Sequence, residues 1–187
     1  MIRARVVLAG LYVTFATSLV TNADEQAAYA ATGPGTYISV GVAGSAMQSD
    51  YGKRQLGGAT VFVDAHLYRR IGVEFEARQL KFHSSEGIGE RTYLVGPKIS
   101  FKPRTVRPYV KLLAGRGQFT FPFNYAKGSY FVFAPGGGLD WRIDHSRVSL
   151  RLLDFEYQVW PGFTFGAMHP YGISSGVSFQ VFEGPRR

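Results

Sequence analysis

The stretch Tyr171–Phe182, YGISSGVSFQVF, alternates between larger, mostly apolar side chains at its odd positions and small or polar ones at its even positions. A period of two is that of a β-strand whose two faces meet different surroundings. In a soluble sheet the apolar face packs on a core. In a membrane barrel the apolar face meets lipid and the polar face lines the lumen. The other strands decide which of these applies.

Segments of the same kind, rich in β-branched and aromatic residues, recur along the chain. In order they are Thr36–Ser45, Ala59–Leu67, Ile71–Phe82, Arg91–Phe101, Pro108–Phe119, Tyr130–Ile143, Val148–Trp160 and Tyr171–Phe182. None of the segments between them has the apolar period of a helix. The sequence therefore predicts an all-β fold in which consecutive strands are antiparallel neighbours.

The predicted connections between these strands alternate in length. The shorter ones are Tyr68–Arg70, Lys102–Arg107 and Asp144–Arg147, and the longer ones are Ala46–Gly58, His83–Glu90, Thr120–Ser129 and Pro161–Pro170. This alternation is typical of an up-and-down barrel with one tight rim and one elaborated rim, and it disfavours a Greek-key sandwich. We therefore expect an eight-stranded antiparallel barrel with both chain ends on the tight rim.

Charged residues occupy mid-strand positions, and most of them lie on one face. The predicted lumen set is acidic at Asp64, Glu74, Glu76, Asp140, Asp154 and Glu156, and basic at Arg78, Lys98, Lys111, Arg116, Arg142 and Arg151. An eight-stranded barrel has room inside only for side chains, so these charges must pair with one another. The opposite face is nearly free of charge, as lipid requires, because Arg or Lys at the bilayer midplane costs about 2–4 kcal/mol.

Strict alternation does not bring every one of these residues inside. It places Arg151 on the lipid face and separates Lys111 from Arg116. We predict β-bulges at Leu112-Leu113 and at Leu152-Leu153, because each extra residue resets the parity of its strand. The alternative is that Arg151 lies on the lipid face near a rim of the barrel, with its guanidinium group extended to the water. Ser175 is predicted on the lipid face without an explanation.

Aromatic residues crowd the predicted strand ends, which suggests two interfacial girdles. The girdle at the long-loop rim comprises Phe119, Phe121, Phe123, Tyr125, Tyr130, Phe131, Tyr157, Trp160, Phe163 and Phe165, and the girdle at the tight rim comprises Tyr68, Phe101, Tyr109, Trp141 and Phe182. The alternative is that these side chains fill a soluble core.

The N-terminus has the layout of a secretory signal, with a basic start and the apolar run Val6–Val20. We expect a signal peptide at residues 1–23, with Ala30 as an alternative cleavage site, a flexible lead-in at 24–35, the barrel at 36–182 and a short tail at 183–187. The alternative is that this segment is an uncleaved membrane anchor, although the apolar run Val6–Val20 is short for a membrane span. The formal charge of +8 is scattered, which argues against nucleic-acid binding.

Five motifs in order carry a resemblance to a known family: YLVGPKISF, RPYVKLLAG, GGGLDWRI, LRLLDFEYQ and YGISSGVSFQVF. Together they resemble the small outer-membrane β-barrels of Gram-negative bacteria, the OmpA-like or porin-family eight-stranded barrel. The resemblance implies a monomer in the outer membrane, surrounded by its lipid and lipopolysaccharide. It also implies insertion by the outer-membrane assembly machinery, which reads a final aromatic residue, here Phe182.

For function the sequence favours a structural or surface-recognition role, carried by four longer outer loops above a side-chain-filled lumen. The alternatives are a narrow porin-like diffusion channel, a soluble lipocalin-like barrel and a lipid A-modifying hydrolase. The hydrolase idea rests on His83 and Ser85, whose spacing is similar to that of outer-membrane deacylases, with Glu86 or Glu90 as the orienting group. We expect no enzyme and no catalytic or cofactor site, because catalytic constellations are sparse. We expect no metal site, because the histidines lack metal-ligand spacing.

Positive charges at the long-loop rim have two readings. Lys53, Arg54, Arg91 and Lys127 could contact the phosphates of lipopolysaccharide, or they could be ordinary solvated loop residues.

Overall fold

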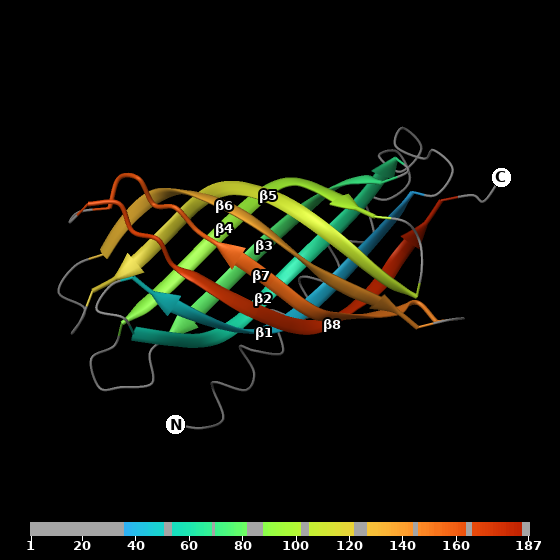
Figure 1. Cartoon of the computed structure of the whole chain (residues 1–187), viewed down its shortest axis with the longest axis horizontal. Helices are drawn as coiled ribbons and strands as arrows, with labels where there is room; N and C mark the ends of the chain where they lie inside the picture. The colour runs from blue at the N-terminus through green and yellow to red at the C-terminus, as the bar shows by residue number, and fades with distance from the viewer. Residues whose placement is uncertain are drawn as a thin grey trace, which may run out of the picture.

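The computed structural model describes residues 36–50, 54–68, 70–81, 88–101, 105–121, 127–143, 146–163 and 166–184. These contain eight strands, which close into one barrel (Figure 1). The strands are β1 (Tyr37–Ser49), β2 (Arg54–Tyr68), β3 (Ile71–Lys81), β4 (Gly89–Ser100), β5 (Val106–Thr120), β6 (Lys127–Arg142), β7 (Val148–Tyr157) and β8 (Tyr171–Glu183). The predicted signal peptide and lead-in lie outside the described residues.

Every strand pairs antiparallel with its neighbour in the sequence, and β8 returns to pair with β1. Closure matters because a strand edge in lipid would leave backbone groups without hydrogen-bond partners. The predicted all-β, eight-stranded up-and-down barrel is therefore confirmed. Among the described residues, no helix is long and apolar enough to cross a membrane.

The closing strand β8 has the orientation predicted from its alternation. Ile173, Phe179 and Val181 are about half exposed on the outward face, whereas Ser174 and Gln180 are buried in the lumen. Most of the outward surface follows the same rule, with Val, Ile, Leu or Phe side chains exposed on every strand. Such a surface is costly in water and favourable in lipid.

The predicted bulge at Leu152-Leu153 is confirmed. The β7–β8 register shifts between Arg151 and Asp154, and both leucines face outward while the two charged side chains are buried. The bulge also explains Ser175, the polar residue in the middle of the outward face of β8. Ser175 Oγ donates a hydrogen bond to the backbone carbonyl oxygen of Arg151 at 3.1 Å, next to the break in the ladder.

The second predicted bulge, at Leu112-Leu113, is wrong. The β5–β6 register runs unbroken through both leucines, with Leu112 opposite Pro135 and Leu113 opposite Ala134. Regular alternation then buries Lys111 and leaves Arg116 exposed on the outward face, so the predicted lumen position of Arg116 is also wrong. Because Arg116 lies near the outer end of β5, a cation is tolerated there without any reset of parity.

The connections at the elaborated rim differ in part from the prediction. The connection between β1 and β2 is limited to residues 50–53, because both strands continue beyond their predicted ends. Gly57 and Gly58, which resemble a loop in sequence, lie inside β2 and pair with Ala46 and Ser45. The long connection of this rim runs from β7 to β8, over residues 158–170. Below, this is called the outer rim, and the opposite one the inner rim.

We predict that Ser175→Ala destabilises the barrel although alanine is the more lipophilic side chain. The change leaves the Arg151 carbonyl without its partner in a water-free layer, at an expected cost of about 1–2 kcal/mol. Urea unfolding in phospholipid vesicles measures the difference. Ser175→Thr keeps the hydroxyl and should stay near wild type, whereas a neutral or stabilising Ser175→Ala would show that the hydrogen bond contributes nothing.

Candidate functional site: a closed lumen

The lumen has three layers along the barrel axis. A small polar cavity lies at the inner rim, a network of ion pairs fills the middle, and a cluster of apolar and aromatic side chains fills the outer end. Each layer is built from the inward positions of several strands, which alternation assigns at every second residue. The chemistry of these layers decides whether anything can pass through the barrel or react within it.

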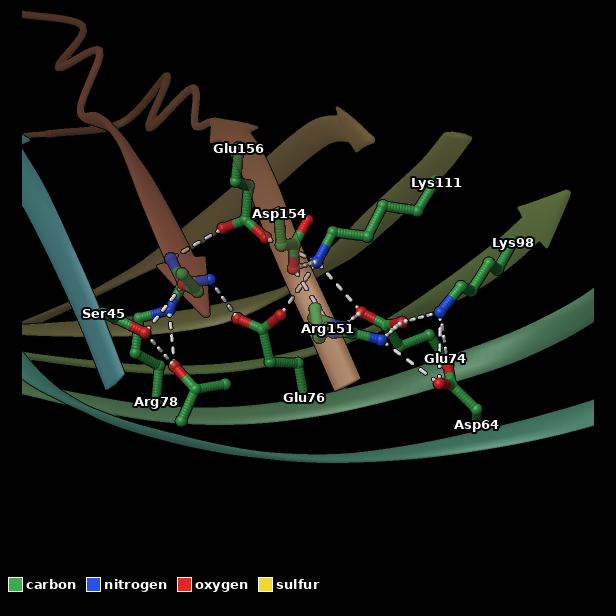
Figure 2. A network of polar contacts seen from close by, with 12 residues as sticks. Ser45, Asp64, Glu74, Glu76, Arg78, Lys98, Lys111, Arg151, Asp154 and Glu156 are labelled. Carbon is green, nitrogen blue, oxygen red and sulfur yellow. Dashed lines mark hydrogen bonds and ion pairs between the residues drawn. The ribbon is translucent and has the colours of Figure 1, made fainter. Parts of the chain in front are cut away.

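Glu74 on β3 is the centre of the ion network (Figure 2). Its carboxylate contacts Lys98 Nζ at 3.0 Å, Lys111 Nζ at 2.9 Å and Arg151 Nη2 at 2.7 Å. The three cations come from β4, β5 and β7, so one carboxylate joins four strands across the lumen. Glu74 has no solvent-exposed surface, and a buried carboxylate in such a place is stable only when cations and hydrogen bonds surround it.

Lys111 occupies the position that a metal ion would take. The carboxylates of Glu74, Glu76 and Asp154 lie close enough together to share a cation. The Lys111 ammonium contacts Glu74 at 2.9 Å, Glu76 at 3.0 Å and Asp154 at 2.7 Å. The place of a metal ion in this cluster is therefore taken by a cationic side chain of the protein itself.

Two arginines extend the network towards the two ends of the barrel. Arg151 contacts Asp64 at 3.2 Å and Asp140 at 3.4 Å, and its guanidinium lies 3.6 Å from the centre of the Phe62 ring. Arg78 binds Glu76 and, at 3.0 Å, Glu156. Planar guanidinium groups suit such positions because each can serve two carboxylates and stack on a ring at once.

The outer end of the lumen is an apolar plug. Its buried members are Met47, Leu56, Leu80, Ile88, Leu94, Leu113, Phe119, Phe121, Val132, Ala134, Trp160, Phe163 and Met168. The rings of Phe119 and Phe163 meet edge to face with centres 5.3 Å apart, a favourable aromatic geometry. A plug of this kind excludes water, so a continuous aqueous path from the outer to the inner rim does not run through the described interior.

Several residues predicted for the aromatic girdles belong to the lumen, and those predictions are wrong. Phe119, Phe121, Trp160 and Phe163 are buried in the plug, and Tyr130 packs against it. Tyr109, assigned to the inner girdle, is also buried in the lumen, and Lys98 Nζ lies 3.9 Å from its ring centre.

Other members of the predicted girdles do face outward. Exposed rings are those of Phe131 and Tyr157 near the outer rim and Tyr68, Phe101 and Trp141 near the inner rim. Phe123, Tyr125 and Phe165 lie outside the described residues. The girdles therefore exist on the outward face, but with fewer members than the sequence suggested.

The plug and the ion network are joined by a chain of hydrogen bonds. Trp160 Nε1 donates to Gln158 Oε1 at 2.8 Å, and Gln158 Nε2 donates to Glu156 Oε1 at 2.7 Å. Glu156 in turn accepts from Arg78. The Trp160 ring packs directly against the backbone of Gly117: a Cβ atom added at Gly117 would lie 2.2 Å from the ring atom Cη2 of Trp160. A glycine is needed at that position because any larger residue would displace the ring.

The inner rim holds a polar cavity of about 30 Å³. Its walls include Tyr37, Asp64, Asp140, Arg142 and Gln180. Arg142 Nη2 donates to Gln180 Oε1 at 3.1 Å, which fixes both side chains at the mouth. A space of this size holds little more than water.

The lumen prediction succeeded at every charged position except Arg116. One buried charged residue of the lumen, Glu90, was not predicted from the sequence. Its carboxylate oxygens have no hydrogen-bond partner within the described part of the chain. Glu90 and Lys98 lie an even number of positions apart on β4, so alternation places both on the same, lumen-facing side. This could have predicted the position of Glu90. His83, Ser85 and Glu86, on which the hydrolase alternative depends, lie outside the described residues.

The geometry defines a class: a closed eight-stranded barrel with an apolar exterior and a charged, filled lumen, which is the architecture of a transmembrane β-barrel. No protein-family model matches the sequence. No curated protein matches it either.

Solved structures do match the fold. Neisserial surface protein A aligns with a TM-score of 0.64 at 11% identity, covering 78% of this chain and 96% of that one. Ail of Yersinia pestis, solved with the heparin analogue sucrose octasulfate, aligns with a TM-score of 0.50 at 21% identity, covering 79% of this chain and 100% of that one. Identities this low show the fold. The chain has the fold of the small outer-membrane barrels, as its sequence motifs suggested, and the predicted location, the outer membrane, agrees with it.

We predict that Glu74→Gln destabilises the barrel by about 3–5 kcal/mol, because it removes the one carboxylate that Lys98, Lys111 and Arg151 share in a buried site. Asp140→Asn is the matched control. Its carboxylate also contacts Lys98 and Arg151, but its side chain is 24% exposed towards the inner cavity, so water compensates and the loss should be smaller. Equal losses for the two variants, by urea unfolding in vesicles, would contradict the central role of Glu74.

Gly117→Ala tests the fit of the plug. The added methyl group meets the Trp160 ring and should cost about 1–3 kcal/mol through overpacking. Gly57→Ala places the same methyl group in open space on the outward face of β2, and it should change the free energy of unfolding by less than about 0.5 kcal/mol. Tryptophan fluorescence in a Trp141→Phe background, where Trp160 is the remaining tryptophan, reports whether the ring has moved. If both variants are neutral, the plug is looser than the structure indicates.

Proposed function

We propose that this outer-membrane barrel is a non-conducting protein that acts at the cell surface through its outer rim. One observation carries the proposal: the lumen is filled by the ion network and then by the apolar plug. A protein whose interior is occupied by its own side chains can offer a partner only its rims and its outward face. The outer rim carries the β7–β8 connection, whose residues Gln158 and Trp160 are anchored in the lumen by hydrogen bonds.

The partners we propose are the lipid and lipopolysaccharide around the barrel, and the assembly machinery during insertion. The apolar outward face supports the first. For the second, Phe182 lies near the end of β8, opposite Ile38 of β1. We propose a monomer, because closure leaves the eight strands without an unpaired edge for a second copy. A surface-recognition role is supported by the fold it shares with Ail, whose structure contains a heparin analogue.

The other functions have less support. A narrow diffusion channel would need a wet path, and the residues of the plug, such as Leu94 and Val132, have no exposed surface. The hydrolase depends on His83 and Ser85, and we keep the expectation that the chain is not an enzyme. A soluble lipocalin-like barrel would carry its apolar side chains inside, whereas here Ile173 and Phe179 face outward.

We predict that the protein fractionates with detergent-extracted outer membranes and shows heat-modifiable mobility on gels, because a closed barrel resists detergent until it is boiled. In planar bilayers and in liposome swelling it should produce neither conductance nor solute uptake. Steady conductance from the folded protein would overturn the closed-lumen proposal, and recovery in the soluble periplasmic fraction would overturn the membrane assignment itself.

A further inference from the structure

Four cations lie on the outward face of the barrel near the outer rim. They are Lys81 on β3, Arg91 on β4, Arg116 on β5 and Lys127 on β6, and all four are exposed. We call this set the cationic outer face. Outward positions of a membrane barrel are where charge is least expected, because Arg and Lys cost free energy in hydrocarbon. Four of them on consecutive strands therefore require an explanation.

The strand registers place these residues side by side. One row of paired residues on the outward face of β3 to β6 consists of Gln79, Arg91, Gln118 and Ser129. The next row on this face, one step closer to the middle of the barrel, consists of Ala77, Tyr93, Arg116 and Phe131. Arg91 and Arg116 are thus diagonal neighbours on adjacent strands, about 7–8 Å apart by the usual spacing of such pairs. Lys81 and Lys127 lie in the row one step closer to the outer rim, on the first and last of these four strands.

The cationic outer face has no counter-charge of its own. None of its four members forms an ion pair with another described residue, and no Asp or Glu occupies an outward position of β3 to β6. Like charges on neighbouring strands repel. The lumen cations differ completely, since Lys98, Lys111 and Arg151 each contact two or more carboxylates. The outward cations need an anion from outside the chain.

The outward residues around the cationic outer face show how deep it lies in the membrane and on which strands it is confined. One step below the Arg116 row, the outward residues are Phe75, Val95, Ala114 and Phe133, which are apolar. The set therefore lies at the boundary between hydrocarbon and headgroups, where long cationic side chains reach outward. On the other half of the barrel, the outward row nearest the outer rim that spans β7, β8, β1 and β2 consists of Tyr157, Tyr171, Gln48 and Gln55, and it contains no cation.

We propose that the cationic outer face binds the phosphate groups of lipid A in the outer leaflet, with Arg91 and Arg116 as its core. A guanidinium group binds a phosphate through paired, charge-assisted hydrogen bonds, and two neighbouring arginines can share one phosphate. Tyr93 and Phe131, which flank Arg116, would contact the start of the acyl chains, as aromatic side chains do at membrane interfaces. This inference rests on the proposed membrane location and names the lipid that the barrel binds.

The test uses the barrel folded in dodecyl maltoside micelles, whose headgroups carry no phosphate, and fluorescently labelled lipid A that carries both phosphates. Arg91→Gln/Arg116→Gln should weaken binding tenfold or more, because each lost charge-assisted contact is worth more than a neutral hydrogen bond. The control is Arg70→Gln/Arg147→Gln, which removes two exposed arginines near the inner rim and should keep the affinity within twofold. Lipid A without phosphates should bind the wild type weakly and should not distinguish the variants.

Equal affinities of wild type and the Arg91/Arg116 variant for phosphorylated lipid A would overturn the inference. So would equal binding of phosphorylated and dephosphorylated lipid A by the wild type, a result that needs no variant to fold. Competition by inorganic phosphate at millimolar concentration would assign the site to free phosphate and not to lipid. Arg91→Lys/Arg116→Lys, which keeps the charge, should recover part of the affinity.

Heat-modifiable mobility of each variant shows that it is folded. It also separates this inference from the proposed function. A wild type that does not enter membranes refutes the proposed function, whereas one that inserts normally but binds lipid A without Arg91 and Arg116 refutes only the inference.

Discussion

The contacts of Glu74 with Lys98, Lys111 and Arg151 are the interaction on which the interior depends. Eight strands enclose too little space for bulk water, so any charged side chain that alternation turns inward must find its partner in the protein. The six carboxylates and four cations of the network meet that requirement by sharing, with each cation contacting two or more carboxylates. Once strands β3, β4, β5 and β7 are joined in this way, the lumen cannot open without breaking several buried ion pairs together.

Parity along the strands explains both the success and the failure of sequence reasoning about these charges. The same argument predicted bulges at Leu152-Leu153 and Leu112-Leu113, and only the first exists. Arg151 lies among Asp140 and Asp154 at mid-depth, where an outward guanidinium would be in hydrocarbon, so the chain must add a residue. Arg116 lies near the outer end of β5, where an outward cation reaches the headgroups. Depth in the membrane decided between the two, and depth cannot be read from alternation.

Aromatic residues show a second limit of the same kind. Phe119 and Phe131 occur close together in sequence and both near strand ends, yet one is in the plug and the other faces lipid. Phe119 shares the parity of Lys111 in an unbroken β5 and therefore lies in the lumen. The bulge predicted at Leu112-Leu113 reversed that parity, so the wrong bulge also explains why Phe119 was assigned to the outward face. The extension of β2 through Gly57 and Gly58 could not be predicted, because two adjacent glycines resemble a loop, and it is pairing with β1 that keeps them in the sheet.

A filled lumen moves the chemistry of the molecule to its exterior. Inside, nearly every charged group of the network is satisfied by another part of the chain, and the plug keeps water from competing for those contacts. Outside, Arg91 and Arg116 have no partner among the described residues, although the same guanidinium chemistry is used at Arg78 and Arg151. Cations that stand together on the outward face with no carboxylate beside them are favourable where something beyond the chain can pair with them. For a barrel in lipid, at headgroup depth, the anion within reach is a phosphate.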